Sequence, residues 1–270
     1  MLAKDNFTVY TFAIERADSL SKFDNIVMCS TLEETVEKSD IVVGPIPLSS
    51  NRKNINTPFS EEIISLEKLF SVLDNRKFIA GGIYDDIYKL TEDKSIEIID
   101  LMQREELAVL NTISTAEGAI QIAMEETLAT LHGANVLILG FGRIGKILSK
   151  MLSGIGSNVY CEARRNSDIA WIKAYGYNSV HINELESSLN KFNIIINTIP
   201  CLILDDKKLE KVNQDCLIID LASNPGGVDR NAAKAKGIKT VWALSLPGKV
   251  APLTSAEFIK ETIYNILKEM

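Results

Sequence analysis

Short apolar runs alternate with amphipathic stretches along the whole chain. Strands of a parallel sheet are buried on both faces and are almost continuously apolar, whereas the helices between them carry one apolar face. The pattern predicts an α/β protein. Strands are expected in the first half at residues 7–12, 25–30, 40–47, 77–83 and 95–101, and in the second half at residues 135–139, 158–163, 193–200, 216–223 and 239–244.

Two longer amphipathic segments predict helices. Residues 60–73 begin with glutamates, which the positive end of a helix dipole favours. Residues 104–131 predict a connecting helix that ends before Gly133, a residue typical of helix C-termini. Its apolar face recurs at helical spacing and consists of Ile120, Met124, Leu128 and Leu131.

The connecting helix separates two predicted domains. Residues 1–132 are expected to form an N-terminal α/β domain on the substrate side, and residues 133–270 a doubly wound parallel sheet of the Rossmann type. The last helix follows Pro252 and starts with Thr254-Ser255-Ala256-Glu257, a capping-box pattern. An alternative arrangement packs this helix back on the first domain.

A glycine cluster joins the strand expected at residues 135–139 to a helix. Its sequence is Gly140-Phe141-Gly142-Arg143-Ile144-Gly145. The first glycine permits a tight turn, the second lets the backbone approach a pyrophosphate, and the third lets helix and strand pack closely. The helix N-terminus then offers N–H groups to the phosphates. We therefore expect a dinucleotide to bind at residues 140–145; the alternative is a Rossmann domain without a cofactor.

The end of the next strand indicates which dinucleotide binds. NAD-binding domains usually carry Asp or Glu at this position for a ribose hydroxyl, but this chain reads Ala163-Arg164-Arg165. Guanidinium groups bind phosphate by charge-assisted contacts, so Arg164 and Arg165 predict the 2′-phosphate of NADP(H). The competing acid, Glu162, should project from the opposite face of the strand. Alternatively, both arginines are solvated surface charges.

Composition narrows the class of partner. A formal net charge of −7 argues against nucleic acid or an anionic membrane. No CxxC pair occurs among the four cysteines, Cys29, Cys161, Cys201 and Cys216, so we interpret them as buried, reduced thiols. No residue spacing indicates a metal site. No apolar stretch approaches the roughly 18 residues that span a bilayer, and no signal peptide is evident, so the cytoplasm is the expected location.

Five ordered segments resemble the family of the A subunit of dipicolinate synthase: residues 111–127, 137–146, 193–200, 218–229 and 243–257. The resemblance implies an NADP-dependent dehydrogenase that oxidises a dihydrodipicolinate-type cyclic dicarboxylate to dipicolinate. The reaction would come late in a branch of lysine biosynthesis that serves bacterial sporulation. The resemblance also implies a partner, the flavoprotein that forms the B subunit of the synthase, and the chain could also form a homo-oligomer.

One departure from this family concerns the first residues. Family members usually begin with an additional strand and a turn containing Gly, Asp and Arg. This chain instead opens at Met1-Leu2-Ala3, which resembles the end of the helix that follows that turn. We therefore expect either a truncated start or a shorter first domain, with one strand fewer in the first sheet.

Further candidate residues follow strands of the second half, at the carboxyl edge where open α/β sheets bind ligands. Thr198, Ile199 and Pro200 are expected to border the nicotinamide ribose, unless they only end a strand. Ser223 begins a loop with two consecutive glycines. Such glycines permit either close approach of a ligand or a tight turn.

Two residues are candidates for catalysis. Glu117 could act as a general acid or base, or its carboxylate could serve only a capping box with Ser114. Lys249 could pair with a substrate carboxylate, or be an ordinary exposed loop lysine. Arg52 and Lys53 are weaker candidates for binding the dianionic substrate.

The lack of an unmistakable catalytic residue leaves other functions open. His132, near the end of the connecting helix, and His181, in a polar segment, are expected to have structural roles. One alternative function is a related dehydrogenase of a hydroxy, keto or amino acid. Another is a non-catalytic NADP-binding subunit that positions a partner flavoprotein.

Overall fold

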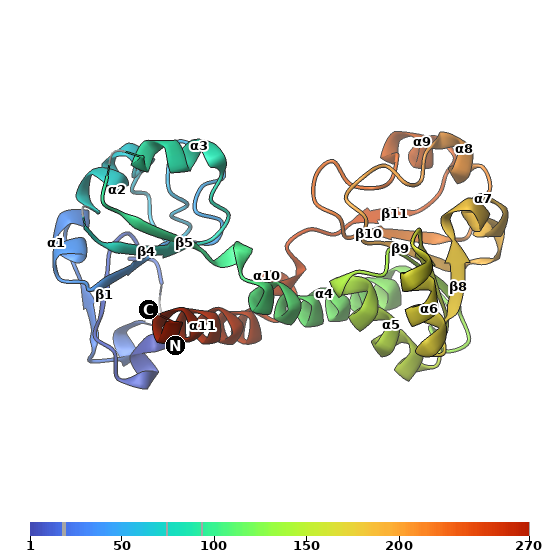
Figure 1. Cartoon of the computed structure of the whole chain (residues 1–270), viewed down its shortest axis with the longest axis horizontal. Helices are drawn as coiled ribbons and strands as arrows, with labels where there is room; N and C mark the ends of the chain where they lie inside the picture. The colour runs from blue at the N-terminus through green and yellow to red at the C-terminus, as the bar shows by residue number, and fades with distance from the viewer. Residues whose placement is uncertain (18–19, 74, 93, 270) are drawn as a thin grey trace. The chain divides into compact units, whose positions relative to one another are not determined.

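The computed structural model describes residues 1–17, 20–73, 75–92 and 94–269 (Figure 1). It contains two compact units. The first unit comprises Met1–Ala108 and Ala256–Met270, and the second comprises Val109–Ser255. Each unit has its own parallel β-structure and its own core.

The long helix α4 (Glu105–Glu126) runs from one unit into the other. Most of it belongs to the second unit, because Ala116, Ala119 and Ala123 are completely buried in that unit's core. The compact units therefore divide at residue 108, whereas the sequence placed the boundary near residue 132. The short apolar side chains of α4 determine this difference, since they allow the helix to pack closely on the second sheet.

The second unit contains a six-stranded parallel sheet in the order β11-β10-β9-β6-β7-β8. This is the order of a doubly wound Rossmann sheet, as predicted. Its strands are β6 (Asn135–Leu139), β7 (Asn158–Ala163), β8 (Asn178–His181), β9 (Ile194–Asn197), β10 (Leu217–Asp220) and β11 (Thr240–Trp242). Strand β8 was not predicted, because its sequence Asn-Ser-Val-His is mostly polar and lies at a sheet edge.

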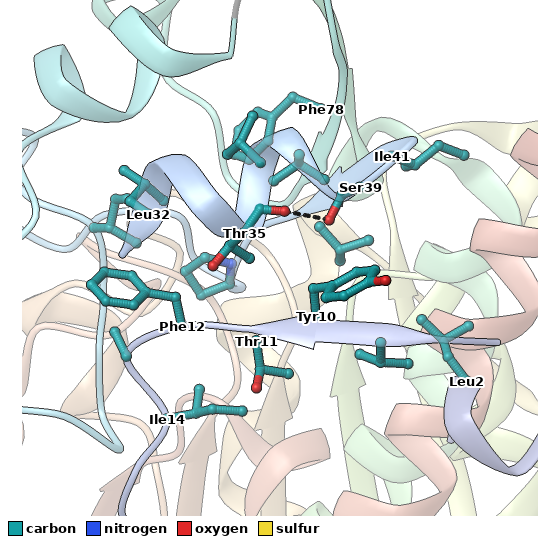
Figure 2. Close-up of a pocket in the computed structure, with 18 of the residues that line it drawn as sticks. Leu2, Tyr10, Thr11, Phe12, Ile14, Leu32, Thr35, Ser39, Ile41 and Phe78 are labelled. Carbon is teal, nitrogen blue, oxygen red and sulfur yellow. Dashed lines mark hydrogen bonds between the residues drawn. The ribbon is translucent and has the colours of Figure 1, made fainter. Parts of the chain in front are cut away.

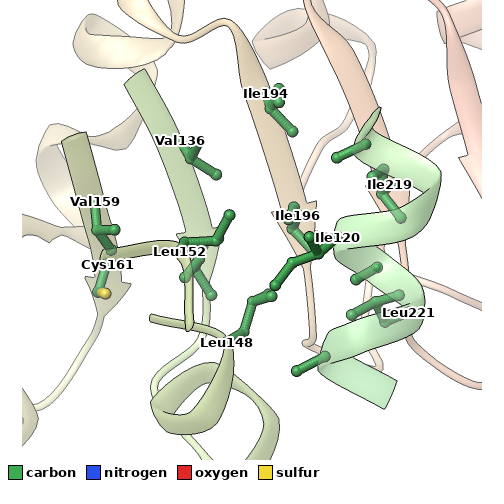
Figure 3. Packing of buried hydrophobic residues seen from close by; sticks show 14 of the residues in the cluster. Ile120, Val136, Leu148, Leu152, Val159, Cys161, Ile194, Ile196, Ile219 and Leu221 are labelled. Carbon is green, nitrogen blue, oxygen red and sulfur yellow. The ribbon is translucent and has the colours of Figure 1, made fainter. Parts of the chain in front are cut away.

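Helices cover both faces of this sheet (Figure 1). One face packs against α4, α5 (Arg143–Ile155) and α6 (Asn166–Ala174). Figure 3 shows Ile120 of α4 beside Ile196, Ile219 and Leu221 of this core. The other face packs against short helices, namely η5 (Ile182–Glu184), α7 (Leu185–Ser188), η6 (Leu189–Lys191), α8 (Asp206–Leu209) and α9 (Arg230–Ala235).

The helix predicted over residues 104–131 is wrong at its C-terminal end. Helix α4 stops at Glu126, where the Thr127 hydroxyl donates to the carbonyls of Ala123 and Ala129. Met124 and Leu128, two members of the predicted apolar face, are exposed. Only Ile120 and Leu131 of that face are buried, and Leu131 reaches the core from the loop after the helix.

The first unit contains two parallel sheets. The two-stranded sheet pairs β1 (Val9–Thr11) with β2 (Ile26–Met28). The three-stranded sheet has the order β3-β4-β5, with β3 (Ile41–Val43), β4 (Lys77–Ala80) and β5 (Glu97–Asp100). The shorter elements before, between and after these strands are η1 (Leu2–Asp5), η2 (Leu20–Lys22), α1 (Leu32–Glu37), α2 (Leu66–Val72), α3 (Asp85–Tyr88), η3 (Lys89–Thr91) and η4 (Leu101–Gln103).

Two clusters of apolar residues hold the first unit together. Helices α1, α2 and α3 pack around Phe78 of β4. The last helix, α11 (Pro252–Glu269), contributes Ile263 and Ile266 to a second cluster that contains Ile79 of the same strand. Since successive side chains of a strand point to opposite faces, the two clusters cover the two faces of the three-stranded sheet.

Two predicted helix starts are wrong. Helix α2 begins at Leu66, because the Ser65 side chain caps it and Ile55 N–H donates to Ile64 O, which holds the preceding residues extended. Helix α11 begins at Pro252, so the pattern at residues 254–257 lies inside the helix and is not a cap. The Ser255 hydroxyl instead donates to the carbonyl of Pro247, in the short helix α10 (Leu246–Val250).

The cysteines differ in environment. Cys161 and Cys216 are buried, and burial raises the pKa of each thiol to about 12. Cys29 is half-buried and Cys201 is exposed, so the expectation of buried thiols is wrong for these two. Within the described ranges, no group of three or more His, Cys, Asp or Glu side chains is placed to hold a metal ion. No helix in that part of the chain is long and apolar enough to cross a membrane.

Candidate dinucleotide-binding site

The glycine turn between β6 and α5 is shaped by two of its three glycines. Gly140 has a φ of +91°, and a Cβ at this position would lie 2.7 Å from the Thr198 hydroxyl. A Cβ on Gly145 would lie only 2.2 Å from the carbonyl oxygen of Gly140. A side chain on Gly145 would therefore push α5 away from the turn, and one on Gly140 would displace Thr198 and Ile199.

Gly142 has a different role in this turn. It caps the N-terminus of α5 without a side-chain hydrogen bond, and a Cβ there would meet nothing within 4 Å. The first-turn N–H groups of a helix have no partner inside the helix and favour an anion. The residues of this turn therefore fit the pyrophosphate of a bound dinucleotide.

Two arginines follow β7, and the structure distinguishes them. Both are exposed at the start of α6. The Arg165 guanidinium donates to both carboxylate oxygens of Asp168, from Nε at 2.8 Å and from NH2 at 3.3 Å. The Arg164 guanidinium has no hydrogen bond or ion pair with the residues that the structure describes. Arg164 is therefore available for a ligand, whereas Arg165 would first have to leave an exposed ion pair.

Glu162 lies next to the glycine turn. Val159, Cys161 and Ala163 face the α5 side of the sheet, so Glu162 projects from the opposite face, as the alternation predicted. The side chain is 1% exposed. One carboxyl oxygen accepts from Gly140 N–H at 3.3 Å, and the other has no hydrogen-bond partner. Burial raises the pKa of this carboxyl, so its neutral form is favoured.

His181 holds the backbone beside Arg164. Its Nε2 lies 3.2 Å from the carbonyl oxygen of Arg164, and its Nδ1 accepts from Asn183 N–H at 3.3 Å. A neutral ring with the proton on Nε2 satisfies both contacts. This arrangement is structural, because it ties the turn after β7 to the end of β8.

The residues after β9 contact the glycine turn directly. The N–H and the hydroxyl of Thr198 both donate to the carbonyl oxygen of Leu139, at 3.0 and 2.8 Å. The Ile199 side chain packs against Gly140, where a Cβ would lie 2.9 Å from it. Pro200 is exposed. The structure therefore brings Thr198 and Ile199 to Gly140, at the carboxyl ends of the two central strands.

A buried hydrogen-bond network organises the loop after β10. The Asp220 carboxylate is completely buried and accepts from the side-chain amide of Asn197 at 2.7 Å and from the N–H groups of Ala222 and Gly227 at 3.1 and 2.8 Å. A Cβ on Gly227 would lie 2.2 Å from the Asn197 amide nitrogen. A Cβ on Gly226 would lie 2.7 Å from Asp220. Packing within the protein thus accounts for the consecutive glycines.

Sequence reasoning missed Asn197 and Asp220. The available signal was a single polar residue at the end of each of two apolar runs, Ile-Ile-Ile-Asn and Leu-Ile-Ile-Asp. Ser223, which was predicted, is exposed, and its carbonyl oxygen accepts from Gly226 N–H at 2.8 Å. The network therefore places the loop that carries Ser223 at the same sheet edge as Thr198.

Comparisons with known proteins agree with this arrangement. Residues 1–102 match the model of the N-terminal domain of the dipicolinate synthase A subunit. Residues 108–232 match the NAD-binding domain of D-isomer-specific 2-hydroxyacid dehydrogenases. Over 271 aligned residues the chain is 30% identical to the dipicolinate synthase A subunit of Bacillus subtilis (strain 168), covering 100% of this chain and 91% of that protein. The chain belongs to the family of the dipicolinate synthase A subunit.

Two crystal structures of family members resemble this fold. The dipicolinate synthase A subunit from Bacillus halodurans has a TM-score of 0.88 and 28% identity, covering 98% of this chain and 91% of that one. The corresponding protein from Bacillus subtilis also has a TM-score of 0.88 and 28% identity, with coverages of 99% and 90%. This family member therefore contains a dehydrogenase-type domain for a nicotinamide cofactor, and its glycine turn and the residues up to Ser223 lie inside the matched range.

The two catalytic candidates of this family member lie on neighbouring elements. Glu117 is exposed in the middle of α4. Ser114 also lies inside this helix and not at its start, so the capping box predicted for the two residues is wrong. The buried hydroxyl of Ser114 has no hydrogen-bond partner. Lys249 is exposed on α10. Gly118, next to Glu117, packs against Leu246 and Val250 on either side of Lys249.

The remaining candidates have other surroundings. Arg52 belongs to the first unit, where its guanidinium lies over the Tyr84 ring at 4.5 Å and forms an ion pair with Asp86 at 3.7 Å. Lys53 is exposed in the same segment. His132 packs against Gly156, where a Cβ would lie 2.5 Å from the ring. Arg52 and His132 thus make these contacts with other residues of the same protein.

Proposed function

We propose that this chain is an NADP(H)-dependent dehydrogenase subunit that oxidises a dihydrodipicolinate-type cyclic dicarboxylate to dipicolinate. The observation that carries the proposal is the open helix N-terminus at Gly142 together with the exposed guanidinium of Arg164, in a member of the family of the dipicolinate synthase A subunit. The first feature supports a dinucleotide and the second supports one with a 2′-phosphate.

Each residue of the proposed site has a binding task. The first-turn amides of α5 bind the pyrophosphate, and Arg164 pairs with the 2′-phosphate while Arg165 exchanges between that phosphate and Asp168. Thr198, Ile199 and Pro200 border the nicotinamide ribose, and the loop of Ser223 lies beside them. Because Leu139 already accepts the Thr198 hydroxyl proton, this hydroxyl contributes its oxygen lone pairs as an acceptor.

The proposed reaction removes two hydrogens from the substrate ring. The bound nicotinamide supplies the hydride acceptor, and the ring loses a proton from a neighbouring atom as it becomes aromatic. Aromatisation provides driving force, so orientation and charge stabilisation are the main tasks of the protein. We assign Lys249 to a substrate carboxylate and Glu117 to the proton. Both side chains are exposed and can move toward a bound ring.

The proposal includes a protein partner and a biological setting. The name of the Bacillus subtilis relative describes that protein as one subunit of a synthase. We propose that this chain works with a flavoprotein of the kind that forms the B subunit, in the formation of dipicolinate for sporulation. A non-catalytic role is the second candidate, because the two residues assigned to the reaction, Glu117 and Lys249, are both exposed.

The test supplies freshly generated dihydrodipicolinate and NADP⁺, with and without the partner flavoprotein, and follows both dipicolinate and NADPH. The proposal predicts equal amounts of the two products from this chain alone. Turnover only with the partner would support the non-catalytic role. Turnover of hydroxy, keto or amino acids without dipicolinate would show a related dehydrogenase instead.

Matched variants connect the reaction to the site. Lys249→Gln should raise KM for the dicarboxylate, whereas Lys234→Gln, an equal charge change at an exposed position of α9, should not. Glu117→Gln should lower kcat more than it changes KM. Unchanged kinetics in both site variants would remove these residues from the mechanism.

A further inference from the structure

Buried polar groups without a partner are places where a proton or a ligand has a large energetic effect. The cavity of about 900 Å³ in the first unit is lined mainly by apolar side chains, and the Ser39 hydroxyl in its lining donates to the carbonyl oxygen of Thr35 (Figure 2). Among the described residues, the buried side-chain oxygens without a partner belong to Ser114 and Glu162. Of these two side chains, only the Glu162 carboxyl can gain or lose a charge.

Glu162 lies in an otherwise apolar row of the second sheet. Its register partners are Leu139 of β6 on one side and Val180 of β8 on the other, and both of these side chains belong to the same core. The Glu162 side chain is 1% exposed, and its one hydrogen bond within the described ranges comes from Gly140 N–H at 3.3 Å. A carboxylate here would therefore be a buried charge with a single donor.

Asp220, a second buried carboxyl of this sheet, shows what such a charge requires. It accepts from the side-chain amide of Asn197 and from the N–H groups of Ala222 and Gly227. Three donors suit a carboxylate. With one donor, leaving a hydroxyl unpaired in apolar surroundings costs less than leaving a charge unpaired. The surroundings of Glu162 therefore suit a neutral carboxyl.

Two charged or titratable side chains act on Glu162 from nearby. Arg164 follows on the same strand, and His181 lies at the end of β8, while β6 contributes the apolar Leu139. Both favour the carboxylate, but burial has the larger effect and raises the pKa of the carboxyl. The His181 ring contacts the backbone of Arg164 and Asn183 instead of the Glu162 carboxyl.

Glu162 adjoins both groups of residues that we propose for phosphate binding. Its donor, Gly140, begins the glycine turn that leads into the N-terminus of α5. Arg164, proposed for the 2′-phosphate, follows two positions later in the chain. A negative charge on Glu162 would repel a dinucleotide, and it would repel one with a 2′-phosphate more strongly because that ligand carries more negative charge.

We infer that Glu162 is a specificity-determining residue whose proton permits NADP(H) to bind, because the neutral carboxyl adds no negative charge to the site of the 2′-phosphate. The inference rests on the proposed function, in which NADP(H) is the cofactor. At a pH where the free protein has released this proton, binding of NADPH takes one proton up from water. The affinity for NADPH therefore falls as pH rises, and the carboxylate form favours NADH.

The experiment measures the affinities for NADPH and NADH by calorimetry from pH 5.5 to pH 9. Glu162→Gln has nearly the shape of the neutral carboxyl, so it should bind NADPH like the wild type at pH 5.5, within about twofold. Toward pH 9 the wild type should become roughly tenfold weaker than this variant, the effect of charges about 10 Å apart at an effective dielectric constant of about 20. The difference should be smaller for NADH.

A matched control removes an equal charge elsewhere. Glu184 is exposed in η5, and Glu184→Gln should follow the wild type at every pH. Ionisation of the 2′-phosphate itself, near pH 6, strengthens binding as pH rises and is common to all variants, so the ratio between proteins isolates the carboxyl.

Proton uptake provides a second readout that needs neither turnover nor a variant. Calorimetry in buffers with different heats of ionisation counts the protons taken up with each NADPH. The wild type should take up as much as one proton above pH 7, where the phosphate has already lost its own proton. Glu162→Gln should take up less. His181→Gln should retain the uptake, although histidine ordinarily changes charge between pH 5 and 8.

Three results would overturn the inference. The first is the same pH dependence and proton uptake in the wild type and in Glu162→Gln. The second is tighter NADPH binding by Glu162→Gln at every pH without a difference in uptake, because the carboxyl would then be charged throughout. The third is an uptake that disappears only in His181→Gln. Failure of the proposed function has another signature: equal affinities of the wild type for NADH and NADPH at pH 5.5.

Discussion

Replacing Arg164 by glutamine should remove most of the preference for NADPH over NADH. A hydrogen bond to a charged group contributes about 1.5–3 kcal/mol. Arg164 is exposed, so water weakens this contact and we take the lower value, about 1.5 kcal/mol, which corresponds to roughly tenfold in affinity. NADH lacks the 2′-phosphate, so its affinity should stay within about twofold.

The ion pair between Arg165 and Asp168 predicts effects of different size on the affinity for NADPH. Arg165→Gln should weaken NADPH binding less than Arg164→Gln, because Asp168 already holds the Arg165 guanidinium in the free protein. Asp168→Asn removes a negative charge beside the 2′-phosphate and releases Arg165. At about 4 Å in water, that repulsion amounts to roughly 1 kcal/mol, so NADPH should bind up to about fivefold more tightly.

Calorimetry with both cofactors measures these effects directly. Lys173→Gln is the matched control, because it removes one exposed positive charge from the other end of the same helix. Both cofactors should bind this control as they bind the wild type. Equal losses in Arg164→Gln and Lys173→Gln, or an unchanged ratio of the two cofactors in Arg164→Gln, would show that Arg164 is an ordinary surface charge and would refute the reasoning.

Three further predictions concern the same sheet edge. Gly142→Ala should keep the wild-type Tm but bind NADPH at least about tenfold more weakly, whereas Gly145→Ala should lower Tm itself, since overpacking costs about 1–3 kcal/mol. The pKa of the Glu162 carboxyl is raised in the folded protein, so above pH 4.5 the unfolded chain loses this proton first. The free energy of unfolding should therefore fall as pH rises above that value. Urea titrations of Glu162→Gln should not show this fall. Asp220→Asn leaves buried donors facing one another, and calorimetric melting should show a loss of about 1–3 kcal/mol; a wild-type Tm would contradict the network.

Strands of the second sheet could be predicted where the pattern is local. Residues 135–139 and 158–163 match β6 and β7, because both faces of these strands are buried and their sequences are correspondingly apolar. Edge strand β8 is mostly polar, and nothing in its own sequence separates it from a loop. The start of α2 failed for a related reason: Ile55 N–H donates to Ile64 O, and this contact with a neighbouring segment holds the residues before Ser65 extended.

The glycine turn could be predicted because its chemistry lies within six consecutive residues. The contacts that hold the other loops could not. Asp220 and Asn197 are 23 positions apart and meet only because β9 and β10 are paired in register. Asp168 could have been found, since it lies three positions after Arg165 at the start of a helix, a spacing at which side chains pair.

Hydride transfer on this chain is the central claim, and deuterium labelling measures it most directly. Dihydrodipicolinate deuterated at the ring carbon that is oxidised is incubated with the protein and NADP⁺, and the NADPH formed is examined by mass spectrometry. The account predicts one deuterium in NADPH for each dipicolinate formed, at a rate that falls in Gly142→Ala. Dipicolinate that forms without labelled NADPH, or with its deuterium released to water, would contradict it.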